Sequence, residues 1–165
     1  MSYVDTSIIV AALDPSDSRS GDATKILEEE TYKVISELTI LELASVLSRK
    51  WKLLSDIADR LGLDRGLTII AIILYLIRRF NLRYRGIKTQ SKTTPLGRIY
   101  KPIADAVEIA STLNLRTLDL LHISYIKLLR EEDEPIHKLI TADKDFRAVK
   151  DYLEKNLGIH LSILE

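Results

Sequence analysis

Residues 2–10 read Ser-Tyr-Val-Asp-Thr-Ser-Ile-Ile-Val, so a single carboxylate, that of Asp5, stands inside an apolar run. Burying an unpaired carboxylate costs several kcal/mol, so Asp5 needs a partner. Thr6 and Ser7 can cap a helix that starts at Ile8, which places Asp5 at the C-terminal end of a short buried strand. Open α/β sheets bind their ligands at that end. Further carboxylates arriving there would indicate a divalent cation site.

Short strands and helices alternate along the chain, which is typical of an α/β sandwich with a parallel sheet. A capping box of Thr39 and Glu42 is predicted to open one helix, and Pro102 another. The segment Lys88–Lys101, with Pro95 and Gly97, is predicted to be a flexible loop. Strands are predicted at residues 2–4, 32–36, 138–141 and 159–164, and a last helix at residues 145–157. The helix after Pro102 is predicted to bury an apolar stripe of Ile103, Ala106, Val107, Ala110 and Leu113.

The composition is that of a globular protein of 165 residues, which is long enough for one domain to fold unaided. There is no cysteine, which excludes disulfides and thiolate metal sites and fits a reducing cytoplasm. We expect a cytoplasmic protein because the chain does not open with the pattern of a secretory signal. The apolar run Leu67–Ile77 is too short to span a bilayer, so no membrane contact is expected. It is predicted to form a buried helix or one shared across the interface of a homodimer.

The charges are unevenly distributed although Lys and Arg equal Asp and Glu at 24 each. No acid falls between Gly66 and Ala104, whereas eight Lys and Arg do. This asymmetry predicts an acidic site beside a basic docking surface, or else a solvated basic loop.

Acids fall at predicted strand ends or in first helical turns at Asp5, Glu42, Asp119, Asp143 and Asp145. Taken singly, most have a structural explanation: Glu42 belongs to the capping box, Asp119 complements a helix dipole, and Asp143 caps the last helix. Asp5 is harder to explain in this way because it interrupts a buried run.

Four motifs in this order resemble the PIN domain, particularly the VapC-type ribonuclease toxins. They are Tyr-Val-Asp-Thr-Ser at residues 3–7, Glu42 in a helix after a strand, Leu-Arg-Thr-Leu-Asp-Leu-Leu-His at 115–122, and Thr-Ala-Asp-Lys-Asp-Phe at 141–146. The resemblance implies a three-layer sandwich, a small parallel sheet flanked by helices. It also implies a carboxylate pocket that binds Mg²⁺ or Mn²⁺ and hydrolyses RNA.

By this resemblance, Asp5, Glu42 and Asp119 fall on the family's core acidic positions. Two candidates remain for the fourth metal-binding and catalytic acid, and we favour Asp143 at the strand end, with Asp145 as an additional metal or metal-water contact. Water activated by the cation would leave a 5′-phosphate and a 3′-hydroxyl.

Four further residues are predicted to support the acids. Arg116 and His122 lie three residues either side of Asp119, so they can contact a phosphate or steady the carboxylate. His122 can also do no more than hydrogen-bond Asp119. Thr6 and Ser7 can hold metal-bound water, or they can be plain helix caps.

The chain is predicted to be a single PIN-like domain over residues 1–165, with a helical and basic extension at about 52–101 that compact members of the family lack. An acidic pocket repels RNA, so the basic part of this extension is predicted to grip the RNA backbone, with Tyr84 and Tyr100 to stack on bases. Its proposed RNA-binding residues are Arg83, Arg85, Lys88, Lys92, Arg98 and Lys101.

The leading functional hypothesis is a metal-dependent endoribonuclease that is the toxin of a toxin–antitoxin pair and is inhibited by a small antitoxin protein. An RNA-maturation nuclease shares the same chemistry. A PIN-fold module that binds RNA or protein without cutting is the alternative from another class, but the retained acids argue against it. A response-regulator-like phosphoacceptor lacks a lysine at a convincing position.

Overall fold

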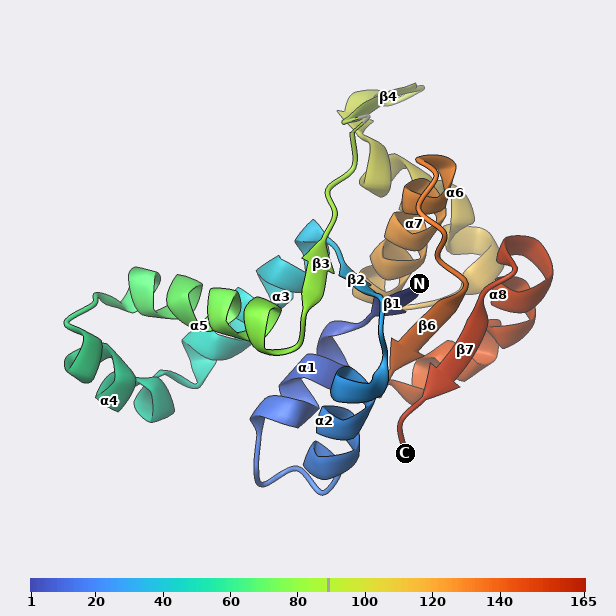
Figure 1. The fold of residues 1–165 in the computed structure, drawn as a ribbon. Helices are drawn as coiled ribbons and strands as arrows, with labels where there is room; N and C mark the ends of the chain where they lie inside the picture. The colour runs from blue at the N-terminus through green and yellow to red at the C-terminus, as the bar shows by residue number, and fades with distance from the viewer. Residues whose placement is uncertain (89) are drawn as a thin grey trace.

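A five-stranded, wholly parallel sheet forms the centre of the fold in the computed structural model (Figure 1). The structure describes residues 1–88 and 90–165, with the side chains of residues 51–53 left aside. The strand order is β3-β2-β1-β6-β7, which confirms the α/β sandwich with a small parallel sheet. The strands are β1 (Ser2–Val4), β2 (Lys33–Ile35), β3 (Leu82–Tyr84), β6 (Lys138–Thr141) and β7 (His160–Ile163).

Helices cover both faces of the sheet, so successive residues of one strand enter different cores. Tyr3 points into one core and Val4 into the other, and Leu139 and Ile140 divide in the same way. This explains why the central positions of β1, β2 and β6 are buried apolar residues, as expected for a sheet covered on both sides. One face carries α1 (Thr6–Leu13), α2 (Ser20–Glu29), α3 (Glu37–Arg49) and α5 (Arg65–Arg79). The other carries α6 (Lys101–Leu113), α7 (Thr117–Glu131), the 3₁₀ helix η1 (Lys144–Val149) and α8 (Lys150–Leu157).

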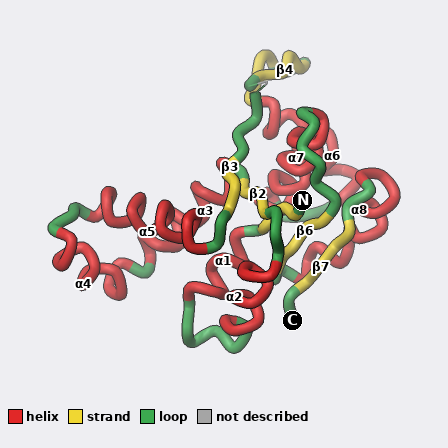
Figure 2. The backbone as a smooth tube through the Cα atoms, in the orientation of Figure 1, coloured by secondary structure: helices red, strands yellow, loops and turns green. Residues whose placement is uncertain are grey.

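Helix α4 (Trp51–Leu61) and helix α5 form a hairpin that projects from the body of the fold (Figures 1 and 2). Gly62 ends α4 in the left-handed conformation at φ 63°, and the Asp64 side chain caps α5 by accepting from the Leu67 amide at 2.8 Å. The inner face of α5 buries Ile73 and Leu76. Its outer face leaves four large apolar side chains at least half exposed: Leu67, Ile70, Leu74 and Tyr75.

The homodimer stays a prediction, and the exposed apolar face of α5 is the surface that we expect to form its interface. We expect the double variant Ile70→Glu/Leu74→Glu to be monomeric where the parent chain is dimeric, because two carboxylates would be buried in an apolar contact. Sedimentation velocity measures this directly. Leu96→Glu is the matched control because Leu96, at 84% exposure, lies on a different element. A double variant that sediments like the parent would locate the interface elsewhere.

The segment predicted to be a flexible loop is a β-hairpin, so that prediction was wrong. Strand β4 (Ser91–Thr94) pairs antiparallel with β5 (Gly97–Tyr100), and Gly97 adopts φ 108° at the turn. Polar side chains fasten the hairpin to the body: Lys92 pairs with Asp105 on α6, and the Tyr100 hydroxyl donates to Glu37 on α3. The extension predicted at about 52–101 also contains Thr89, which lies outside the described residues.

Three helix boundaries differ from the predictions. Helix α1 begins at Thr6 rather than at Ile8, and α3 begins at Glu37 after Ser36, so the capping box predicted from Thr39 was wrong. Residues 144–149 form the 3₁₀ helix that precedes α8, where one helix was predicted. Within the described residues, no helix combines the length and apolarity needed to cross a membrane.

Candidate functional site

An acidic pocket lies at the carboxyl ends of β1 and β6, where the strand order reverses direction. Asp5 directly follows β1, and Asp143 follows β6 after one residue. Helix α3 contributes Glu42, and α7 contributes Asp119 and His122. The pocket has a volume of about 630 Å³, and Thr6, Ser7 and Arg116 also line it. Eight of the nine residues predicted to form or support the site therefore line this pocket, and the ninth, Asp145, lies beside Asp119 and Asp143 at its edge.

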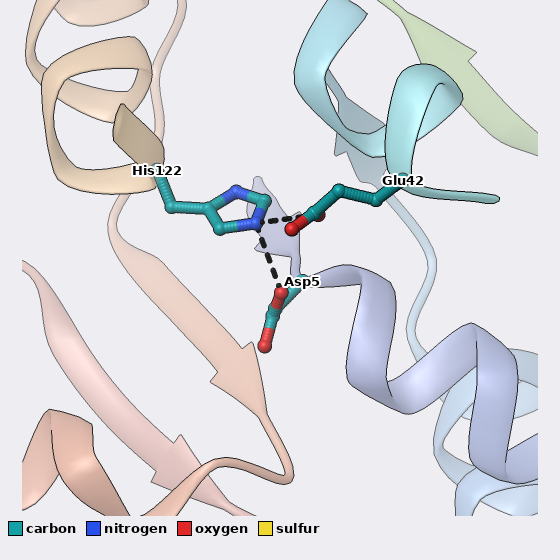
Figure 3. A group of neighbouring side chains, drawn as sticks. All are labelled: Asp5, Glu42 and His122. Atoms are coloured by element: carbon teal, nitrogen blue, oxygen red, sulfur yellow. Dashed lines mark hydrogen bonds and ion pairs between the residues drawn. The ribbon is translucent and has the colours of Figure 1, made fainter. Parts of the chain in front are cut away.

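Asp5, Glu42 and His122 form the first of two groups in this pocket (Figure 3). The His122 Nε2 atom lies 3.1 Å from Asp5 Oδ1 and 3.0 Å from Glu42 Oε2. On its other side, His122 Nδ1 lies 2.8 Å from the Tyr3 hydroxyl, which also hydrogen-bonds the Ser36 hydroxyl at 2.7 Å. Burial of the ring opposes its protonation, but Tyr3, Asp5 and Glu42 outweigh this effect and hold the pKa of His122 well above its ordinary value.

The hydroxyl groups predicted as possible helix caps instead hold the carboxylates. Ser7 and Thr141 each donate to Asp5 Oδ2 at 2.6 Å, and the Thr6 hydroxyl donates to Glu42. Asp5 caps α1 through its backbone only. Burial would raise the pKa of Asp5, but hydrogen bonding and charge from His122, with the two hydroxyls, lower it to about 2. This carboxylate is therefore fixed and charged by the protein itself.

Asp119, Asp143 and Asp145 form the second group, with ligand oxygens all within 4.8 Å of one another. Asp119 Oδ2 is buried and has no hydrogen-bond partner in the described part of the chain. Burial, followed by the charges of Asp143 and Asp5, raises the pKa of Asp119 to about 6. Asp143 lines the pocket, whereas Asp145 lines a neighbouring hollow and lies 3.3 Å from Arg116 Nη2. His122 contacts Asp5 and Glu42, rather than Asp119, which was one of the partners predicted for it.

None of the six residues predicted to bind RNA belongs to this pocket. Three of them form ion pairs: Arg85 with Glu134, Lys92 with Asp105 and Glu108, and Lys101 with Glu131. Of the others, the Arg83 guanidinium lies 5.2 Å from the Tyr32 ring centre, Arg98 donates to the Ser91 hydroxyl, and the Lys88 backbone amide donates to Glu132. Their contact with RNA stays a prediction.

Several residues at the site were not predicted from the sequence, among them Thr141, which donates to Asp5, and also Arg49 and Tyr3. Arg49 lines the pocket from the last turn of α3, seven residues after Glu42 and so two turns further along the same helix face. That spacing was a signal which could have identified it. Tyr3 was assigned only to a buried strand, and no local pattern indicates that its hydroxyl reaches His122 across 119 residues of sequence.

The model of the PIN domain family matches residues 2–152. The chain belongs to the PIN-domain family. The acids in the motifs that suggested the resemblance lie at the ends of β1 and β6 and on α3 and α7 of this PIN domain. A comparison with curated proteins finds no match.

Solved structures share the fold at low sequence identity. VapBC2 from Rickettsia felis, bound to a DNA fragment from its promoter, has a TM-score of 0.57 and 15% identity, with 100% of both chains covered. VapC20 of Mycobacterium tuberculosis, described as a sarcin–ricin loop cleaving toxin, has a TM-score of 0.58 and 17% identity over 90% of this chain and 95% of that chain. A toxin–antitoxin complex from Klebsiella pneumoniae has a TM-score of 0.55 and 16% identity over 88% and 90%.

Proposed function

We propose that this PIN domain is a metal-dependent endoribonuclease and the toxin of a toxin–antitoxin pair. The observation that carries the proposal is the Asp119 carboxylate, which is buried beside other acids and has one oxygen without a hydrogen-bond partner among the described residues. A protein gains no stability from holding like charges together in this way, so such a group is typical of a functional site. The similar structures named as toxins or toxin–antitoxin complexes support the biological role.

The second acidic group fits a hard divalent cation such as Mg²⁺ or Mn²⁺. Asp119, Asp143 and Asp145 offer carboxylate oxygens, which these ions prefer, and the unpartnered Asp119 oxygen points to a missing positive charge. Asp5 and Glu42 would complete the ligand set from the other side of the pocket. When bound, the cation polarises the phosphodiester and lowers the pKa of an attacking water.

The chain's own residues hold the reacting groups in place. Ser7 and Thr141 fix Asp5 through one oxygen, which leaves the other facing His122. Tyr3 orients the His122 ring so that Nε2 lies between Asp5 and Glu42. A protonated Nε2 lies within hydrogen-bond distance of both carboxylates and holds them in position. Such preorganisation avoids rearrangement of the carboxylates when RNA enters.

The proposed activity is tested by incubating the purified chain with a mixed pool of RNAs, with and without Mn²⁺. We expect cleavage only with Mn²⁺, leaving 5′-phosphate and 3′-hydroxyl ends. Cyclic 2′,3′-phosphate ends would contradict hydrolysis by water. RNA binding without any cleavage would favour the non-cutting module.

Metal binding should also raise the melting temperature. An ion that binds only the folded state, at 100 times its dissociation constant, adds about 2.7 kcal/mol, or roughly 5–10 °C for a domain of this size. Asp143→Asn should lose more of this shift than Asp145→Asn, because Asp143 lines the pocket and Asp145 is engaged by Arg116. Calorimetry of the two variants with and without Mn²⁺ makes the comparison. A larger loss in Asp145→Asn would reverse the assignment.

A further inference from the structure

Arginines on two elements flank the acidic pocket. Arg49 approaches from the end of α3, and Arg116 from the residue that precedes α7. Arg49 donates to the Ser45 hydroxyl at 2.7 Å and pairs with no carboxylate in the described part of the chain. Its positive charge is therefore available at the edge of the pocket that holds Asp5, Asp119 and Asp143.

A second hollow, of about 510 Å³, adjoins the acidic pocket at Arg116, which lines both. Lys144 and Arg147 of η1 line this hollow. Arg147 is paired with Glu165. Lys144 is exposed and forms no ion pair among residues 1–88 and 90–165. Two cations without an ion pair among the described residues thus come from elements on opposite faces of the sheet: Arg49 on α3 lines the acidic pocket, and Lys144 on η1 lines the adjoining hollow. Arg116 lines both.

The basic stretch 83–101 compares poorly with this arrangement. Its residues Arg85, Lys92 and Lys101 already neutralise acids of α6, α7 and the segment after α7. At these three residues a phosphate would have to compete with carboxylates, whereas Arg49 and Lys144 offer their charge without losing a carboxylate. Arg83, Lys88 and Arg98 form no ion pair among the described residues, so they define the rival path.

We propose that Arg49 and Lys144 bind the phosphates of a single RNA strand on the two sides of the bond that is cut, so that the strand crosses the acidic pocket from α3 to η1. The proposal rests on the proposed nuclease function and adds the path of the substrate. A single strand is the substrate that fits, because Asp5 and Asp119 are only 5% and 8% exposed at the base of the pocket. The backbone must therefore turn inward to bring a phosphate to them, which an unpaired strand can do.

The test is RNA binding across a salt series in an Asp119→Asn background, which keeps the RNA intact. The probe is a fluorescent single strand of mixed sequence, read by anisotropy. Each phosphate contact contributes about 0.7 to the slope of log affinity against log salt, so Arg49→Gln/Lys144→Gln should flatten the slope by about 1.4. Arg116 stays unchanged, because its ion pair with Asp145 would link the result to the metal ligands.

Two matched pairs, each one Arg and one Lys, complete the design. Arg60→Gln/Lys155→Gln removes exposed charges away from the pocket and should leave the slope at the parent value. Arg83→Gln/Lys88→Gln tests the rival path over the basic stretch. If that pair flattens the slope and the Arg49/Lys144 pair does not, the proposal is overturned.

Cleavage kinetics separate this inference from the proposed function. With Asp119 intact, Arg49→Gln/Lys144→Gln should raise KM on the order of tenfold with little change in kcat, because the contacts are made equally in the ground and transition states. If the parent cleaves RNA but the Arg49→Gln/Lys144→Gln variant shows the parent's KM and salt slope, the proposed path is overturned and the nuclease function stands. If the parent does not cleave RNA but the Arg49→Gln/Lys144→Gln variant flattens the salt slope, the path is supported and the nuclease function is rejected.

Discussion

Asp119→Asn is expected to abolish Mn²⁺-dependent cleavage while making the metal-free protein more stable. The substitution keeps the shape of the side chain but removes the charge proposed to bind the cation. Mutation of a residue that merely supports a metal ligand typically lowers metal affinity or activity about 10–100-fold. Loss of the ligand itself should therefore lower kcat at least about 100-fold. Cleavage of a defined RNA by equal amounts of folded parent and variant measures this effect.

The stability gain follows from the raised pKa of Asp119, about 6 in the fold. A carboxyl group whose pKa is higher in the folded state favours folding below its unfolded value, near 4, and this contribution is lost as the pH rises through 6. At pH 7.5 with chelator, the charged Asp119 therefore destabilises the parent by on the order of 2 kcal/mol, which Asn removes. The difference should shrink towards zero at pH 4. Asp59→Asn, on the exposed side of α4, is the control, and an Asp119→Asn variant less stable than the parent at pH 7.5 would contradict the argument.

The sequence was a good guide to the sheet and to the acids, because both follow from local patterns. Apolar runs of three to five residues between helices predict strands buried on two faces, and β1, β2, β6 and β7 lie where they were predicted. Once the strands are located in the sequence, the positions of the acids at their ends follow. Strand β3 was missed because its residues Arg83 and Tyr84 are exposed and carry no apolar pattern.

The failures come from contacts between distant residues. The apolar stripe predicted for α6 included Ile103 and Val107, but these side chains are 48% and 60% exposed. The helix instead turns the face that carries Asp105 towards the protein interior. That carboxylate is buried between Lys92 and Lys127, and no hydrophobic pattern counts an acid as a core residue. The same contact fastens the β4–β5 hairpin, whose strands have little apolar surface of their own.

The cap role predicted for the Thr6 and Ser7 hydroxyls was wrong for a similar reason. Thr6 and Ser7 stand before an apolar helical run, which is the ordinary signal for a cap. Their partners are Glu42 on α3 and Asp5 at the end of β1. The folded arrangement of three elements decides between capping and holding a carboxylate, and a local sequence pattern cannot.

Asp5→Asn is expected to abolish cleavage as well, but to destabilise the protein. Asp5 is 5% exposed, accepts from Ser7 and Thr141, and faces the buried ring of His122 at 3.1 Å. Removing the Asp5 charge leaves the buried His122 ring with Glu42 as its remaining carboxylate partner, and loss of one partner of a buried ion pair costs up to about 3 kcal/mol. The pKa of Asp5 is lowered to about 2, so its contribution is present above pH 4 and is lost as the pH falls towards 2. Unfolding by urea at pH 7 in chelator measures the loss.

The double variant Asp5→Asn/His122→Gln separates the ion pair from the shape of the side chain. If the cost arises from a stranded charge on His122, removing that ring should recover part of it, so the double variant is more stable than the sum of the single effects predicts. Strict additivity would mean that the Ser7 and Thr141 hydrogen bonds carry the loss. If the Asp5→Asn variant were as stable as the parent, the proposed difference between the two acidic groups, one paired within the protein and one not, would be rejected. Opposite effects of the same Asp→Asn change at Asp5 and Asp119 would mean that the protein neutralises one group itself and leaves the other for a cation.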